Sequence, residues 1–265
     1  MFSHTQMAVK YLHYLLTASN SKGHGMHSPY VFDFITNVLN DDRTFYAYNR
    51  IEAKRRLLQK DKSLLNIKDL GAGSKTLPFK QRTVSSIANS SLKQKKFGQL
   101  LFRMVDYYQP KTILELGTSL GITSSYLAAA KPDAKVITLE GASEVANIAS
   151  KGFKELELMN IQLVEGNFDD TLATVIEELS AIDFSFIDGN HRYEPTVNYF
   201  NKILSASHTS SIIILDDIHW SEEMEDAWVY AKNHEAVTAT IDLFYIGIVL
   251  LNKDFKAKQH FKVRF

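Results

Sequence analysis

Two acidic stretches with nearby histidines contain the side chains best suited to chemistry. The first reads Phe-Ile-Asp-Gly-Asn-His and holds Asp188 and His191; the second reads Ile-Leu-Asp-Asp-Ile-His and holds Asp216, Asp217 and His219. Converging carboxylates repel one another unless a cation neutralises them, and hard oxygen ligands suit Mg²⁺ or Ca²⁺. A histidine beside such a site can act as a general base near neutral pH. Alternatively, the aspartates cap helices and the histidines lie on the surface.

A glycine turn at residues 111–121 is a second place where a ligand could bind. A short apolar strand ending in Glu115 precedes Gly117 and Gly121, and glycine allows the backbone to approach a ligand closely. A dinucleotide-binding turn has the spacing Gly-x-Gly-x-x-Gly and holds a pyrophosphate. Here the spacing is Gly-x-x-x-Gly, and the carboxylate of Glu115 would repel a pyrophosphate but suit an amino group. The pattern favours a cationic, amino-acid-like ligand over NAD, with a ligand-free turn as the alternative.

Two further strand ends carry polar residues of the right kind for a nucleoside. Glu140 closes the next apolar stretch and could accept hydrogen bonds from both ribose hydroxyls, although a glutamate there is often only solvated. Asn167 and Phe168 follow the third apolar stretch. They could hydrogen-bond and pack against an adenine, or they could begin a helix.

From residue 97 onward, short apolar stretches alternate with amphipathic segments. We predict strands at 112–116, 135–140, 161–164, 184–187 and 211–215, and helices at 97–108, 121–130, 143–158, 169–179, 195–205 and 221–234. Such alternation predicts an α/β fold with a parallel sheet covered on both faces. The apolar runs 236–242 and 245–251 have no helix between them, so we expect them to pair antiparallel. The expected fold is Rossmann-like and doubly wound, with seven mostly parallel strands and an antiparallel last strand.

Residues 1–95 differ from the rest and are predicted to form a helical cap on a ligand-binding domain at 96–265. Helical spacing at 7–15, a Ser-Pro helix start at 28–29 and a segment at 46–59 indicate three helices. The stretch 67–74 resembles another glycine turn. Because Pro78 interrupts any helix after it, we interpret that stretch as a loop.

Composition excludes several classes of protein. The chain has 265 residues, a net charge of +0 and no cysteine, so a disulfide framework and thiolate metal sites are excluded. No global field attracts nucleic acid or an anionic membrane. The N-terminus lacks the uninterrupted apolar core of a signal peptide, and no run of about 18 apolar residues occurs. We expect a cytoplasmic protein with neither nucleic-acid nor membrane partners.

Taken together, these motifs resemble the class I S-adenosylmethionine-dependent methyltransferases, especially the small-molecule O-methyltransferases of the catechol, caffeoyl-coenzyme A and antibiotic-sugar types. The resemblance covers about residues 97–265 and rests on Glu-x-Gly-Thr-x-x-Gly at 115–121, Thr-Leu-Glu ending at Glu140, Asp-Gly-x-His-x-Tyr at 188–193 and the pair Asp216-Asp217. The Asn-Pro-Pro-Tyr motif of amino-directed DNA methyltransferases is absent. The catechol type has Asp-Asn where this chain has Asp216-Asp217.

The resemblance implies S-adenosylmethionine and Mg²⁺ as cofactors and a small-molecule acceptor of the methyl group, and because such enzymes are often dimers, it makes a homodimer the candidate assembly. It assigns catalysis to Asp188, His191 and His219 and the metal to Asp188, Asp216 and Asp217. Alternatives are a metal-independent methyltransferase, a catalytically idle binding protein and an NAD-dependent oxidoreductase. The implied cofactor-binding residues are Glu115, Gly117, Thr118, Ser119, Gly121, Glu140, Asn167, Phe168 and Asp188.

Overall fold

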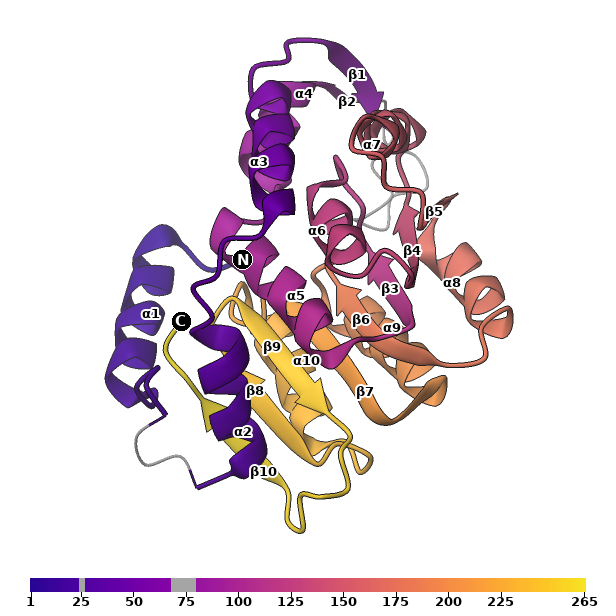
Figure 1. Cartoon of the computed structure of the whole chain (residues 1–265). Coiled ribbons are helices and arrows are strands. Elements are labelled where there is room, and N and C mark those ends of the chain that lie inside the picture. The colour runs from indigo at the N-terminus through magenta and orange to yellow at the C-terminus, as the bar shows by residue number, and fades with distance from the viewer. Residues whose placement is uncertain (24–26, 68–79) are drawn as a thin grey trace. The chain divides into compact units, whose positions relative to one another are not determined.

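The computed structural model describes residues 1–23, 27–67 and 80–265 (Figure 1). The chain divides into two compact units, Asp42–Val175 and a second unit made of Met1–Asp41 with Ile176–Phe265. The stretch 67–74, which we interpret as a loop, falls almost entirely outside the described residues. Within the described part, no helix is long and apolar enough to cross a membrane.

The Asp42–Val175 unit is built on three parallel strands in the order β3-β4-β5. These are β3 (Thr112–Leu116), β4 (Lys135–Glu140) and β5 (Ile161–Glu165), and their buried apolar residues form near-continuous runs. Such runs are typical of strands covered on both faces. The helices that connect or flank them are α5 (Lys95–Tyr108), α6 (Ile122–Ala130), α7 (Ser143–Glu155) and α8 (Phe168–Glu177).

The same unit contains elements that the predicted helical cap lacked. After α3 (Tyr46–Leu58) come a hairpin, β1 (Leu64–Ile67) with β2 (Lys80–Thr83), and α4 (Val84–Ser91). The helix α3 packs against α6, where the Tyr126 hydroxyl donates to Glu52 Oε1 over 2.8 Å. The role of residues 1–95 as a cap stays a prediction.

The second unit contributes five strands in the order β10-β8-β9-β7-β6. Strand β6 (Ile182–Ile187) runs parallel to β7 (Ser207–Asp216), whereas β9 (Ile246–Leu250) is antiparallel to both β7 and β8 (Ala239–Asp242). The expected antiparallel pair is confirmed. Strand β10 (Gln259–Lys262), parallel to β8, is an addition, so among the described residues the mostly parallel mixed sheet has eight strands, against the seven expected. The α/β, Rossmann-like fold class is confirmed.

Helices of the second unit are α1 (His4–Thr17), α2 (Pro29–Phe34), the π-helical η1 (Ile35–Leu39), α9 (Tyr193–Ser205) and α10 (Glu222–Asn233). The helix expected to start at residues 28–29 therefore changes to wider π-helical winding over Ile35–Leu39. The two ends of the chain meet in this unit, since the Tyr14 hydroxyl donates to the Val263 carbonyl and Ser19 forms a β-bridge with Val263.

Candidate functional site

In the glycine turn after β3, several backbone N–H groups are hydrogen-bonded to other groups of the protein. Gly117 N–H and Thr118 N–H both donate to the Leu139 carbonyl, over 3.0 and 3.1 Å. Gly121 N–H donates to the Thr118 carbonyl over 2.9 Å, and Ser119 N–H donates to Glu140 Oε2 over 2.8 Å. A phosphate cradle presents such amides to its ligand. This turn is therefore not arranged to hold a pyrophosphate, which agrees with its departure from the dinucleotide spacing.

Glu140 is fixed at the carboxyl end of β4, directly beside the turn. Its Oε2 accepts from Ser119 N–H over 2.8 Å and its Oε1 accepts from Ala142 N–H over 2.9 Å. The side chain is half-buried. This geometry is compatible with the expected contact to ribose hydroxyls, and that contact stays a prediction.

Glu115 lies inside β3, one residue before the strand ends at Leu116. Its carboxylate is fully buried, and Oε2 accepts from the hydroxyls of Ser124 and Thr138, the latter over 2.6 Å. Thr138 Oγ1 also lies 2.6 Å from Thr118 Oγ1. Glu115 thus supports the turn from beneath through neutral hydroxyls. A direct contact with the methionine part of a cofactor stays a prediction.

The two glycines of the turn allow its backbone conformation and the close packing of a neighbouring helix. Gly117 has φ 99° and Gly121 has φ 79°, values that favour glycine. A Cβ built on Gly121 would lie 2.6 Å from Phe153 Cε1 and 3.1 Å from the Ala149 Cβ of α7. Close packing against α7 therefore explains Gly121, where the sequence suggested close approach of a ligand.

Asn167 behaves as the helix-capping alternative describes. Its Oδ1 accepts from Asp169 N–H over 3.3 Å, and its carbonyl accepts from the Thr171 hydroxyl over 2.9 Å at the start of α8. Phe168 begins that helix and is half-buried. Their contact with an adenine stays a prediction.

In the second unit, Asp188 and His191 form a pair after β6. His191 Nε2 lies 3.4 Å from Asp188 Oδ1, and both side chains are partly exposed, at 28% and 20%. Asn190 holds the loop between them in a left-handed conformation, with φ 53° and its Nδ2 donating to the Tyr199 hydroxyl over 3.3 Å. A carboxylate beside an imidazole can orient the ring for proton transfer.

His219 is enclosed by acidic side chains. Its Nδ1 lies 2.9 Å from Glu225 Oε1 and its Nε2 lies 3.0 Å from Asp242 Oδ2. Lys10 Nζ donates to both oxygens of Glu225 over 2.9 Å. We call these four residues the His219 cluster. Because both ring nitrogens face a carboxylate, the geometry indicates a structural role, and a general base would first have to release one partner.

The three aspartates expected to bind a metal follow β6 and β7, but they do not form a recognisable metal site. Asp216 ends β7 and is 1% exposed, while Asp217 has φ 52° and its N–H donates to the Tyr245 carbonyl over 2.6 Å. Within the described part of the chain, no group of three or more His, Asp or Glu side chains could hold a metal ion. The residues therefore do not fit the implied Mg²⁺, and the magnesium site stays a prediction without structural support.

Sequence reasoning missed the partners of these groups. Thr138 lies opposite Glu115 in the register of β3 and β4 and two residues before Glu140, so pairing the two predicted strands would have found it. Lys10 and Glu225 are 215 residues apart, and no local signal in the sequence connects them.

The fold and the turn define an α/β protein of the kind that binds a nucleoside-containing ligand at the carboxyl ends of parallel strands. Residues 114–218 match the family model described as a methyltransferase domain. The chain is also similar to a catechol O-methyltransferase from Niastella koreensis, with 34% identity over 128 residues, 47% of this chain and 56% of that relative. The chain thus spans little more than half the length of the curated relative that it matches.

Solved structures share the fold at low sequence identity. An O-methyltransferase from Bacillus cereus in complex with SAH has a TM-score of 0.57 at 17% identity, covering 83% of this chain and 97% of that one. TomG, an O-methyltransferase from Streptomyces achromogenes involved in tomaymycin synthesis and in complex with SAM, has a TM-score of 0.56 at 17% identity, covering 84% and 95%. The resemblance to class I S-adenosylmethionine-dependent O-methyltransferases is confirmed by the match of residues 114–218 to a methyltransferase-domain model and by the similarity to a catechol O-methyltransferase.

Proposed function

We propose that this protein transfers the methyl group of S-adenosylmethionine to a hydroxyl oxygen of a small molecule. The observation that carries the proposal is the glycine turn, whose amides are bonded within the protein while Glu140 is fixed beside it by Ser119 N–H and Ala142 N–H. A turn of this kind suits a ribose and a cationic amino-acid portion better than a pyrophosphate. The methyltransferase-domain match at 114–218 supports the same cofactor.

Calorimetric titration of S-adenosylmethionine tests the donor. We expect binding, and we expect Glu140→Ala to weaken it roughly 100-fold, because hydrogen bonds to a charged acceptor contribute about 1.5–3 kcal/mol each. Glu165→Ala is a matched control, since Glu165 ends the neighbouring strand, opposite Glu140 in the register, and is exposed. Absence of binding by the unmodified protein, or equal effects of the two substitutions, would sink the proposal.

For the reaction itself we propose that the pair His191–Asp188 takes the proton of the acceptor hydroxyl. The sulfonium already activates the methyl group, so the protein must orient donor and acceptor, and orientation can supply roughly 7–11 kcal/mol. Proton removal by a positioned base contributes about 10²–10⁴-fold. The observation behind this choice is the 3.4 Å approach of His191 Nε2 to Asp188 Oδ1.

We expect His191→Gln to lower kcat about 100-fold while the affinity for S-adenosylmethionine stays unchanged. A loss of cofactor affinity with unchanged kcat would instead assign His191 to binding. Magnesium assistance is measured separately, by turnover in EDTA and after titration with MgCl₂. Activity that disappears in EDTA and returns with Mg²⁺ would restore the expected metal.

A further inference from the structure

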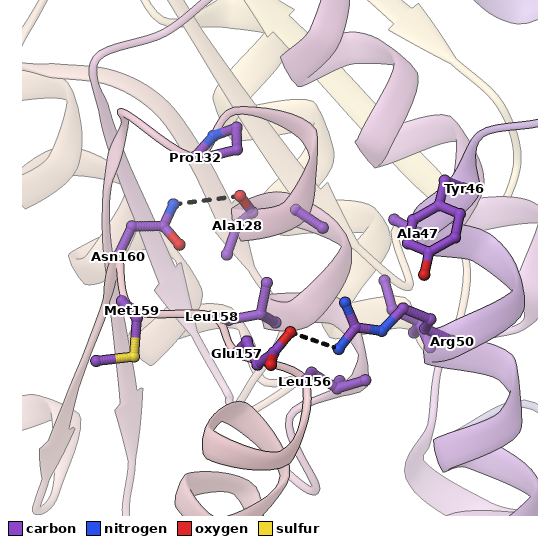
Figure 2. A pocket seen from close by; sticks show the side chains of 12 residues that line it. Tyr46, Ala47, Arg50, Ala128, Pro132, Leu156, Glu157, Leu158, Met159 and Asn160 are labelled. Atoms are coloured by element: carbon purple, nitrogen blue, oxygen red, sulfur yellow. Dashed lines mark hydrogen bonds and ion pairs between the residues drawn. The ribbon is translucent and has the colours of Figure 1, made fainter.

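A cavity of about 320 Å³ lies in the Asp42–Val175 unit, away from the glycine turn. It is lined by the end of α6, by residues 156–160 that lead into β5, and by the first half of α3 (Figure 2). The glycine turn follows the carboxyl end of β3, whereas this cavity adjoins the amino end of β5. Because β3, β4 and β5 are parallel, the two places lie at opposite edges of these strands. We call it the α3–α6 cavity.

The lining of the α3–α6 cavity is mostly apolar. Ala47 of α3 and Ala128 and Ala129 of α6 are small side chains that leave the space open. Tyr46 and Met159, which also line it, are 81% and 88% exposed. Exposed large apolar groups around a hollow often mark a binding site.

Hydrogen bonds hold the walls of this cavity in place without a ligand. Asn160 Nδ2 donates to the carbonyls of Ala128, Lys131 and Ala134, over 3.2, 3.1 and 3.1 Å. Figure 2 shows the bond to Ala128. These bonds tie the segment before β5 to the end of α6. A preformed site loses less free energy in ordering itself around a ligand.

One ion pair crosses the mouth of the cavity. Arg50 Nη2 lies 3.1 Å from Glu157 Oε2, with the two side chains 38% and 78% exposed (Figure 2). Glu157 has φ 61°, in the region that favours glycine. An exposed ion pair contributes only about 0–1 kcal/mol. A second carboxylate can therefore replace Glu157, and the guanidinium fork of Arg50 can bind it through two hydrogen bonds.

We propose that the α3–α6 cavity binds a small carboxylate with an apolar body. The carboxylate pairs with Arg50 in place of Glu157, and the apolar body fills the space over Ala47 and Ala128. The volume lies at the lower end of the range of about 300–1,000 Å³ typical of ligand pockets, which sets the ligand at a single ring or a short chain. This site is separate from the proposed methyl-transfer site and does not depend on that function.

Methyl NMR of the whole protein with 3-phenylpropionate as the probe tests the proposal. We expect saturable shifts at Met159, Leu158 and Ala128, with an apparent Kd that S-adenosylhomocysteine changes less than about twofold. The neutral amide, 3-phenylpropanamide, should bind at least about tenfold more weakly, because it lacks the charge that Arg50 recognises. Absence of saturable shifts at these methyls, equal binding of the amide, or displacement by S-adenosylhomocysteine would overturn the proposal.

Substitutions then assign the contacts. Arg50→Gln should weaken binding at least about tenfold, whereas Arg56→Gln, an exposed arginine of the same helix that does not line the cavity, should change it less than about twofold. Glu157→Gln should tighten binding, because it removes the competing carboxylate. Ala47→Leu should abolish it by filling the space. Equal weakening by Arg50→Gln and Arg56→Gln would show a general charge effect and refute the site.

Discussion

The glycine turn and the His219 cluster both contain carboxylates, but the groups that those carboxylates bind differ. At the turn, Glu115 accepts from hydroxyls and Glu140 accepts from backbone N–H groups. In the cluster, Glu225 faces both His219 and Lys10. We expect a carboxylate that faces a lysine, such as Glu225, to serve the fold, and the half-buried Glu140 beside the turn to serve a ligand. The predictions below test this distinction.

The largest effect is expected at the turn itself, from Gly121→Val. The added side chain would collide with Phe153 and would occupy a φ of 79°. We expect the free energy of unfolding to fall by about 3 kcal/mol in urea denaturation. Gly152→Ala is the control, because Gly152 lies within α7 and its Cβ would meet only the flexible Lys54 side chain at 3.3 Å. Similar losses in both variants would contradict the packing role of Gly121.

Glu115→Ala should lower the free energy of unfolding by about 2 kcal/mol, because two buried hydroxyls lose their acceptor. Glu115→Gln should cost less, since an amide oxygen can still accept. Both are measured by urea denaturation, alongside calorimetry with S-adenosylmethionine. If Glu115→Gln kept its stability but lost the cofactor as severely as Glu140→Ala, Glu115 would be a ligand contact and the contrast between the two glutamates would disappear.

Replacing the two histidines separately tests which of them belongs to the fold. His219→Leu should lower the free energy of unfolding by about 1–2 kcal/mol, since two partly buried carboxylates lose a polar partner, while turnover of the folded protein persists. His191→Leu should lower turnover while leaving the free energy of unfolding nearly unchanged. Urea denaturation and initial rates give the two readings for each variant. A stable His219→Leu protein without activity would make His219 catalytic and break the comparison.

Lys10→Met should have a smaller effect, about 0.5 kcal/mol on the free energy of unfolding. The ion pair with Glu225 spans 2.9 Å, but its side chains are 34% and 29% exposed, so solvent screens it. The loss should shrink further in 1 M NaCl when measured by denaturation. A loss of several kcal/mol that salt does not change would point to packing by the lysine stem instead.

Replacement of His260 should have the smallest and most pH-dependent effect on the free energy of unfolding. Burial, followed by the charges of Lys232 and Lys258, lowers the pKa of His260 below 6.5. At acidic pH the unfolded chain therefore binds more protons than the folded one. The free energy of unfolding keeps its full value above about pH 6.5 and decreases as pH falls through the folded pKa. Between pH 7.5 and pH 5.0 the free energy of unfolding, measured by urea denaturation, should fall less in His260→Gln than in the unmodified protein. An equal loss in both proteins would remove His260 as the cause.

Local pattern was enough to predict the strands and helices around the turn. Strands β3 and β4 begin and end where the apolar runs do. Strand β10 was missed because Gln-His-Phe-Lys carries one apolar residue and depends on pairing with β8 for its existence. The antiparallel pair β1–β2 was missed for a similar reason, since each strand has only four residues and depends on the other for its existence.

For the candidate site, the sequence predicted positions better than partners. It placed Glu140 beside the glycine turn, and the bond from Ser119 N–H agrees with that placement. The sequence suggested that His219 could be a base. It could not show that Glu225 and Asp242 enclose the ring, because these two residues come from other elements of the fold. Tertiary structure decides which ring nitrogen of a histidine can accept a proton from a substrate, and the spacing of residues in the sequence does not reveal it.

The meeting of the two chain ends has a consequence for biosynthesis. The unit Asp42–Val175 is continuous in the sequence, whereas Met1–Asp41 must wait for Ile176–Phe265 before it can make its contacts. Tyr14 finds its acceptor at Val263, 249 residues later in synthesis. During that interval the apolar face of α1 has no partner from its own chain, which makes the nascent N-terminal helix a natural point for chaperone binding and the most vulnerable part of a stalled or truncated product.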